Sequence, residues 1–135
     1  MTEIKELVFC IFRNSAGKFL LQKKTLDYLE GSWTLFGGSR EMGEEPIDSI
    51  KREIFEELEL EPGVNFLFEG VAESEGNTSK IYVFEGKLEL SDIKKIKEGA
   101  GLAFFSKVEL NDLKIFFNSK KAIDIYLKRK GDTFL

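Results

Sequence analysis

The feature that most constrains this chain is an acidic segment with helical spacing, which follows a pair of glycines. The segment runs from Gly37 to Leu60 and reads GGSREMGEEPIDSIKREIFEELEL. Within it, Glu53, Glu56 and Glu57 are three and four residues apart, so on a helix they project from one side. Like charges at this spacing destabilise a helix by roughly 0.2–0.5 kcal/mol per pair. A bound cation would explain why the cluster is present.

The same segment has the periodicity of a helix that packs on a core. Pro46 suits the first turn of a helix, and the acidic residues before it suit the positive end of the helix dipole. Four apolar residues recur at helical spacing on the side away from Glu53 and Glu56, namely Ile47, Ile50, Ile54 and Leu58. We therefore predict a helix with one buried edge and one carboxylate edge.

The rest of the chain predicts more strands than helices. Strands are predicted at residues 4–13, 18–23, 33–36, 64–73, 80–90 and 102–105, with a closing helix at 119–130. A turn at residues 14–17 separates the first two strands and indicates a hairpin. We predict an α/β fold with a mixed sheet between helices, forming a single domain over residues 1–135, a length sufficient for one core.

Residue types that are absent or rare exclude several kinds of site. The chain has no histidine and one cysteine, Cys10, so no internal disulfide and no Ser-His-Asp or Cys-His catalytic pair is possible. A general base must then be a carboxylate, a lysine or a tyrosine. Any catalytic metal must be held mainly by oxygen atoms, which favours magnesium or manganese.

Charge and hydropathy limit the partners. The net charge of −4 disfavours nucleic acid, and the basic run at residues 114–130 is interpreted as the solvated face of a helix. The N-terminus lacks the pattern of a signal peptide, and no apolar run approaches the ~20 residues that span a bilayer. We therefore expect a cytoplasmic protein without membrane partners, either a monomer or a homodimer.

The segment from Gly38 to Leu60 resembles the box of the Nudix family, whose pattern is G-x5-E-x7-R-E-U-x-E-E-x-G-U, with U an apolar residue. The matching positions are Gly38, Glu44, Arg52, Glu53, Ile54, Glu56, Glu57 and Leu60. The family's second glycine is Glu59 in this chain. Because glutamate disfavours the left-handed conformation that ends many helices, we predict that the helix continues toward Glu61 and ends at Pro62-Gly63.

Residues outside the box add to the resemblance. Trp33 precedes the glycine pair as in relatives, although this chain has Phe36 where relatives usually have a proline. Residues 98–106 (EGAGLAFFS) are similar to the segment before the last helix in many small members.

The resemblance implies an α/β/α sandwich in which the box forms a loop, a helix and a second loop. It also implies magnesium-dependent hydrolysis of a nucleoside diphosphate linked to another group, with manganese as an alternative ion. By position, the family's metal ligands are Glu53, Glu56 and Glu57. The backbone carbonyl of Gly37 or Gly38 is a candidate further ligand. Arg52 would orient a box carboxylate through a charge-assisted hydrogen bond, with Glu44 as one possible partner.

The general base is open between two residues. Some family members use a box glutamate and others use an acid from a distant loop. Here Glu53 is one candidate, and Glu98, which precedes a Gly-x-Gly turn, is the other.

The substrate is less constrained. The short chain favours a compact nucleoside triphosphate pyrophosphohydrolase. The alternatives are a nucleotide-sugar or dinucleoside polyphosphate hydrolase and a non-catalytic nucleotide-binding module. Candidate phosphate contacts are Arg13, Lys18, Lys23 and Arg40. Candidates to stack on a base are Phe36, Tyr82 and Phe84.

Overall fold

The structure is a computed structural model that describes residues 4–23, 31–94 and 101–131. The strands are β1 (Lys5–Arg13), β2 (Phe19–Lys23), β3 (Trp33–Thr34), β4 (Phe36–Ser39), β5 (Val64–Ser74), β6 (Asn77–Lys87) and β7 (Gly101–Phe105). The helices are α1 (Pro46–Leu58), the 3-10 turn η2 (Leu90–Asp92), α2 (Lys107–Leu110) and α3 (Phe117–Arg129). The predicted strands and both long helices are present, with boundaries displaced by a few residues, whereas β4 over the glycine pair and the short helix α2 were not predicted.

Strand β1 is the centre of a seven-stranded sheet. It runs parallel to β6 along its whole length and antiparallel to β4, with Val8 opposite Gly38. At its far end Arg13 pairs with Phe19 of β2, which in turn pairs with β3 and β7. Strand β5 pairs with β6 and forms one edge. The prediction of a mixed sheet is confirmed.

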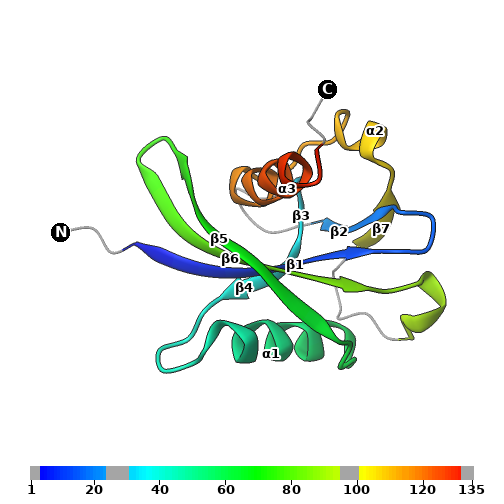
Figure 1. The fold of residues 1–135 in the computed structure, drawn as a ribbon, viewed down its shortest axis with the longest axis horizontal. Helices are drawn as coiled ribbons and strands as arrows, with labels where there is room; N and C mark the ends of the chain where they lie inside the picture. The colour runs from blue at the N-terminus through cyan, green and yellow to red at the C-terminus, as the bar shows by residue number, and fades with distance from the viewer. Residues whose placement is uncertain (1–3, 24–30, 95–100, 132–135) are drawn as a thin grey trace.

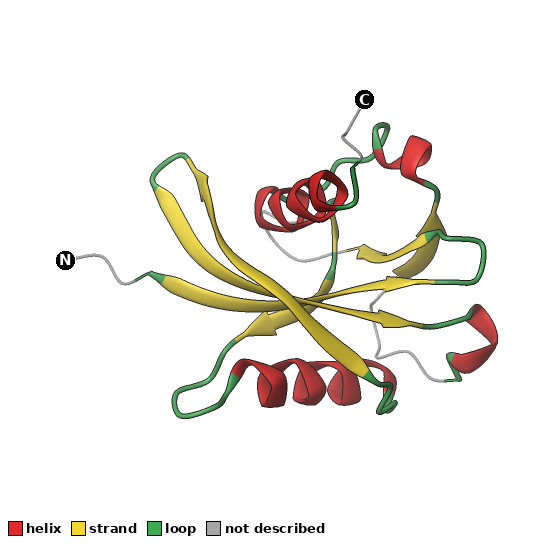
Figure 2. Cartoon of the chain, in the orientation of Figure 1, coloured by secondary structure: helices red, strands yellow, loops and turns green. Residues whose placement is uncertain are grey.

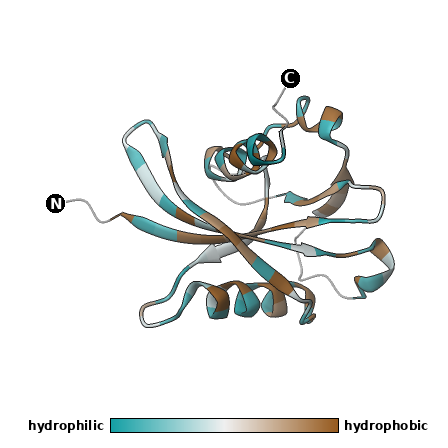
Figure 3. Cartoon of the chain, in the orientation of Figure 1, coloured by the Kyte–Doolittle hydropathy of each residue, from teal (hydrophilic) through white to brown (hydrophobic). Residues whose placement is uncertain are grey.

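The two long helices cover opposite faces of this sheet (Figure 1; Figure 2). The alternation of side chains along a strand explains this arrangement, because successive residues point to opposite faces. On β6, Ile81 and Val83 belong to the core cluster under α3, whereas Tyr82 and Phe84 belong to the cluster under α1. Figure 3 shows hydrophobic residues along the central strands where they cross between the helices. No helix of the described residues is long and apolar enough to cross a membrane.

Helix α1 packs on the sheet through the predicted apolar edge. Ile50, Ile54 and Leu58 are at most 2 % exposed, and Ile47 is partly buried against the same cluster. Burying three such side chains contributes on the order of 1.5–3 kcal/mol each. This packing fixes which side of α1 faces outward, and hence where its carboxylates lie.

Candidate functional site

Arg52 is the centre of a network of carboxylates on the outer side of α1. Its Nε donates to Oε2 of Glu44 at 3.0 Å and its second terminal nitrogen donates to Oε1 at 3.1 Å, a two-point contact. The first terminal nitrogen donates to Glu53 at 3.1 Å and to Glu56 at 3.2 Å. One guanidinium therefore ties the loop before α1 to two carboxylates of the helix, as the sequence predicted for Arg52 and Glu44.

Glu44 is held from a second direction by a serine that the sequence analysis did not single out. Ser49 is fully buried, and its hydroxyl donates to Oε1 of Glu44 at 2.6 Å. The Arg52 guanidinium and then this hydroxyl lower the pKa of Glu44 from 4.5 to about 2. Glu44 is thus a fixed anion that keeps Arg52 in place.

Glu53 lies directly against the glycine pair. A Cβ atom added to Gly38 would be 2.6 Å from Oε1 of Glu53 and 2.7 Å from its carboxyl carbon, so the absence of a side chain at Gly38 makes room for this carboxylate. Burial raises the pKa of Glu53, and the nearby charge of Arg52 opposes that shift. Gly37 has φ of +150°, and a Cβ there would overlap the Val8 carbonyl. Gly37 is thus required by close packing of the backbone, whereas Gly38 makes room for a side chain.

The remaining acidic residues of the box, Glu56 and Glu57, have the oxygen atoms that a hard divalent cation prefers, but their side chains are not gathered around one position. Glu56 is half exposed and Glu57 partly exposed, both near the C-terminal end of α1, where the last turn contains no basic residue. Carboxylates are unfavourable at the negative end of a helix dipole, by roughly 0.3–1 kcal/mol each. Among the described residues no three acidic or thiol side chains are already gathered as a metal site. The Gly38 cradle and the all-oxygen donors suit Mg²⁺ or Mn²⁺, provided that Glu56 and Glu57 turn toward Glu53.

The predicted end of α1 is wrong. The helix ends at Leu58, and Glu59 adopts the left-handed conformation with φ of 54° and ψ of 36°, its N–H donating to the Phe55 carbonyl at 2.8 Å. The backbone thus takes the conformation that a glycine would allow here, despite the Cβ of glutamate. Core packing of Leu58 and the start of β5 at Val64 outweigh a local strain of about 1–2 kcal/mol.

Arg40 contacts the protein on two sides. Its Nε donates to the backbone carbonyl of Glu44 at 2.7 Å, and a terminal nitrogen donates to Oε1 of Glu6 at 3.0 Å. The same Glu6 oxygen accepts the Tyr82 hydroxyl at 2.8 Å. Tyr82 itself is 7 % exposed, so its predicted role in stacking a base is not supported by its position.

The other predicted substrate contacts are not gathered around the box. Arg13 lies at the far end of β1, where it donates to the Gly17 carbonyl and packs 4.5 Å from the Phe19 ring centroid. The nitrogen of Lys23, at the end of β2, lies 5.7 Å from the Trp33 ring centroid. The Arg13 contact with Gly17 joins β1 to the turn before β2, and the Lys23 contact joins β2 to Trp33 of β3.

Two of the aromatic residues that were candidates to stack on a base are buried in the core. Phe36 and Phe84 are both 1 % exposed, and Phe36 packs edge-on against Phe12 in the core under α1. The expectation that Phe36 stacks on a nucleotide is therefore corrected, because its side chain is enclosed. Glu98 lies outside the described residues.

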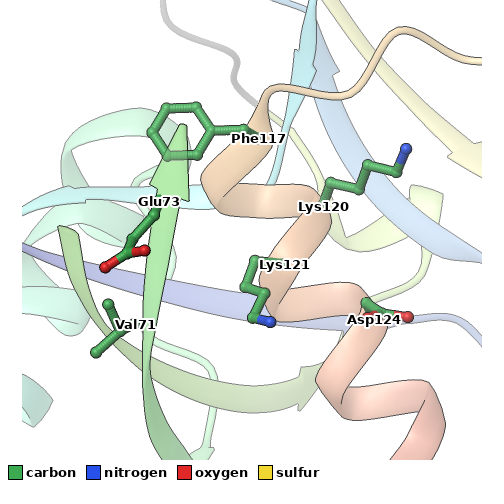
Figure 4. Close-up of a pocket in the computed structure, with 6 residues that line it drawn as sticks. All are labelled: Val71, Glu73, Phe117, Lys120, Lys121 and Asp124. Carbon is green, nitrogen blue, oxygen red and sulfur yellow. The ribbon is translucent and has the colours of Figure 1, made fainter. Parts of the chain in front are cut away.

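One cavity adjoins the box, and another lies on the opposite face of the sheet. One of about 520 Å³ is lined by residues 4–6 and 39–43, and it adjoins Arg52 through Ser39, whose carbonyl accepts from Arg52 at 3.2 Å. Another of about 700 Å³ lies between β5 and α3 and is lined by Val71 and Glu73 of the strand and by Phe117, Lys120, Lys121 and Asp124 of the helix (Figure 4). Since α3 covers the opposite face of the sheet from α1, the second cavity is not part of the box.

Comparison with known proteins agrees with this geometry. The chain is similar in structure to a MutT protein from Methanosarcina mazei (TM-score 0.75, 21 % identity, covering 97 % of this chain and 99 % of that one). It is also similar to the NUDIX domain of Shewanella oneidensis NrtR complexed with ADP ribose (0.76, 14 %, 96 % and 90 %). A third is the Escherichia coli dihydroneopterin triphosphate pyrophosphohydrolase (0.71, 12 %, 95 % and 99 %). Comparison with curated protein sequences gave no match.

The family assignment rests on the sequence itself. Residues 5–125, which include every described strand and both helices that flank the sheet up to the last turn of α3, match the NUDIX domain. With the Arg52 network and the Gly38 cradle in place, the chain belongs to the Nudix family.

Proposed function

We propose that this protein hydrolyses a diphosphate linkage in a nucleoside triphosphate or a related nucleotide. The single observation that carries the proposal is the intact arrangement around Arg52, which fixes Glu44 and contacts both Glu53 and Glu56. A domain that only bound nucleotides would have no need of this set of carboxylates. Every charged position of the box is present in the sequence.

In this proposal Glu53, Glu56 and Glu57 hold Mg²⁺ or Mn²⁺ with the backbone carbonyl of Gly38. A divalent ion there supplies charge neutralisation for the phosphate oxygens and lowers the pKa of bound water. In this proposal Arg52 orients Glu53, and Glu56 would exchange its hydrogen bond with Arg52 for a contact with the ion. The two hydrogen bonds to Glu44 would keep Arg52 in place after that exchange.

The reaction follows from the phosphate chemistry. Water attacks a phosphorus atom, the bond from that phosphorus to the bridging oxygen breaks, and a nucleoside triphosphate gives a nucleoside monophosphate and pyrophosphate. Glu53 or Glu98 takes the proton of the attacking water. Glu98→Gln separates the two, because loss of the base lowers kcat by roughly 10²–10⁴-fold, whereas Glu53→Gln would also remove a proposed metal ligand.

The metal site is tested by titrating Mn²⁺ into the wild type and into Glu56→Gln. We expect Glu56→Gln to bind Mn²⁺ at least about 10-fold more weakly, since it removes a charged ligand. The matched control is Glu61→Gln, an exposed glutamate beyond the end of α1. Equal Mn²⁺ affinity in the wild type and Glu56→Gln would show that the box does not hold the ion.

Turnover of the eight standard ribo- and deoxyribonucleoside triphosphates is tested by following phosphate and pyrophosphate release. Turnover of nucleotide sugars and dinucleoside polyphosphates is tested by following the mononucleotides that they would give. The similarity to the NrtR domain complexed with ADP ribose favours a second candidate, a module that binds an ADP-ribose-like nucleotide. Binding of ADP-ribose without turnover of any compound in this panel would favour that module over an enzyme.

A further inference from the structure

The loop between β4 and α1 carries Glu44 but has no regular structure to hold it. Residues 41–43 are exposed, and only residues 46–58 belong to the helix. Within the loop, the Glu44 N–H donates to the Glu41 carbonyl at 3.1 Å. The Glu41 N–H in turn donates to Oε1 of Glu44 at 3.1 Å. Both bonds lie within the loop and do not fix it against the sheet, so its position must depend on contacts from outside.

Those contacts come from β1 and β6 through Arg40. The Arg40 backbone N–H donates to the Glu6 carbonyl at 2.9 Å, which extends the pairing of β4 with β1 by one residue. Its side chain then bridges Glu6 and the Glu44 carbonyl, with the guanidinium 5.6 Å from the Tyr82 ring centroid. The side chains of Arg40 and Glu6 are 25 % and 40 % exposed, so the pair is partly shielded from solvent.

Tyr82 completes this set from beneath. It is nearly buried in the α1 face of the sheet, and its hydroxyl donates to the same Glu6 oxygen that accepts from Arg40. The hydroxyl therefore orients the carboxylate toward the loop. Together, Tyr82, Glu6 and Arg40 form a continuous line of hydrogen bonds from the centre of the sheet to the backbone of Glu44.

We propose that Tyr82, Glu6 and Arg40, here called the loop brace, are positioning residues that hold Glu44 where it can fix Arg52. The inference rests on the proposed function, because its purpose is to keep the metal-holding carboxylates in register. It assigns Arg40 a role different from phosphate binding. The brace holds the Glu44 backbone and Arg52 holds the Glu44 carboxylate, so the loop is restrained at both ends of one residue.

The test uses Tyr82→Phe, which removes the hydroxyl and keeps the ring, and Glu6→Gln, which keeps the shape and removes the charge. The matched control is Tyr126→Phe, another buried tyrosine on the opposite face, whose hydroxyl lies 3.4 Å from Arg13. All variants are compared at a temperature at which circular dichroism shows them folded.

Two measurements are made on each full-length variant. Mn²⁺ affinity is expected to fall roughly 3- to 10-fold in Tyr82→Phe and Glu6→Gln, somewhat less than for a residue that contacts a metal ligand directly. Limited trypsin digestion is expected to cut after Arg40 several-fold faster in both, because the loop is released. Glu6→Ala also removes the oxygen that accepts the Tyr82 hydroxyl, so adding Tyr82→Phe to Glu6→Ala should change neither measurement further.

The outcomes separate the brace from the proposed function. Cleavage after Arg40 and Mn²⁺ affinity both equal to those of Tyr126→Phe would overturn the brace. An effect of Tyr82→Phe that is fully additive with that of Glu6→Ala would also overturn it, since the Tyr82 hydroxyl would then act independently of Glu6. If instead trypsin cleaves the variants faster but Glu56→Gln binds Mn²⁺ like the wild type, the loop restraint stands and the metal-dependent function fails.

Discussion

Substitution of Gly38 by alanine is the sharpest perturbation of this site. The added Cβ would lie 2.6 Å from Oε1 of Glu53, whereas ordinary contact begins near 3.4 Å, so the carboxylate must move by about 0.8 Å. The group that moves is the end of a flexible side chain, and the fold should lose only about 1 kcal/mol with the Arg52 hydrogen bond. A misplacement of about 1 Å in a reacting site lowers the rate by about 100-fold.

We therefore expect Gly38→Ala to stay folded while losing about 100-fold in kcat/KM and binding Mn²⁺ more weakly. The assay is pyrophosphate release from whichever nucleoside triphosphate the wild type hydrolyses, together with Mn²⁺ titration and thermal unfolding. Two neighbouring controls bracket the result. Gly63→Ala meets no atom within 4 Å and should be neutral, whereas Gly37→Ala meets the Val8 backbone at 1.8 Å and should disrupt the fold.

The reasoning would be refuted by a folded Gly38→Ala whose Mn²⁺ affinity and turnover lie within about threefold of the wild type. That result would mean that Glu53 has another productive position away from Gly38. If Gly38→Ala lost its fold as fully as Gly37→Ala, that would contradict the expectation that the Glu53 side chain moves more easily than the backbone.

Three further predictions follow from the same structure. Glu59→Gly should be more stable than Glu59→Ala by about 1 kcal/mol in urea unfolding, because both variants lose the side chain but only alanine has a Cβ that is strained in the left-handed conformation. Equal stabilities of the two variants would contradict a strain at this position. The low pKa of Glu44 stabilises the fold above its unfolded value of 4.5, and this contribution disappears as the pH falls toward 2. Wild type should therefore lose its advantage over Glu44→Gln between pH 4.5 and 2, and a constant difference would argue against the Arg52 contact. Mn²⁺ at 100 times the Kd of the wild type should stabilise the wild type by about 2.7 kcal/mol, and should stabilise Glu56→Gln, whose Kd is at least 10-fold higher, by no more than about 1.4 kcal/mol at the same concentration.

Much of the fold follows from local pattern. The spacing of Ile50, Ile54 and Leu58 predicted the buried edge of α1, and the strand predicted at residues 80–90 places alternate side chains on the two faces of the sheet. These predictions held because burial depends on periodicity, which is visible in the chain. The contact of Arg52 with Glu44 is one that the resemblance to the Nudix box had suggested, with Glu44 as one possible partner.

The residues that sequence reasoning missed depend on contacts between distant segments. Ser49 lies between Asp48 and Ile50, and nothing in the sequence around it indicates a contact with Glu44. Tyr82 and Glu6 are 76 residues apart and meet only because β1 and β6 are neighbours in the sheet. The prediction that Phe36 stacks on a base was wrong because aromatic character does not tell whether a strand residue faces the core.

The charges of the box explain why its geometry needs so much support. Four carboxylates, at Glu44, Glu53, Glu56 and Glu57, are balanced by the single guanidinium of Arg52. Arg52 uses two of its nitrogens on Glu44 and shares a third between Glu53 and Glu56, so it organises the group without neutralising it. The remaining negative charge on the helix favours a divalent cation, and the same charge would push the loop outward if nothing tied it to the sheet. A restraint that acts on the Glu44 backbone rather than on its carboxylate leaves that charge intact, which is the property required of a site that must still attract a metal ion.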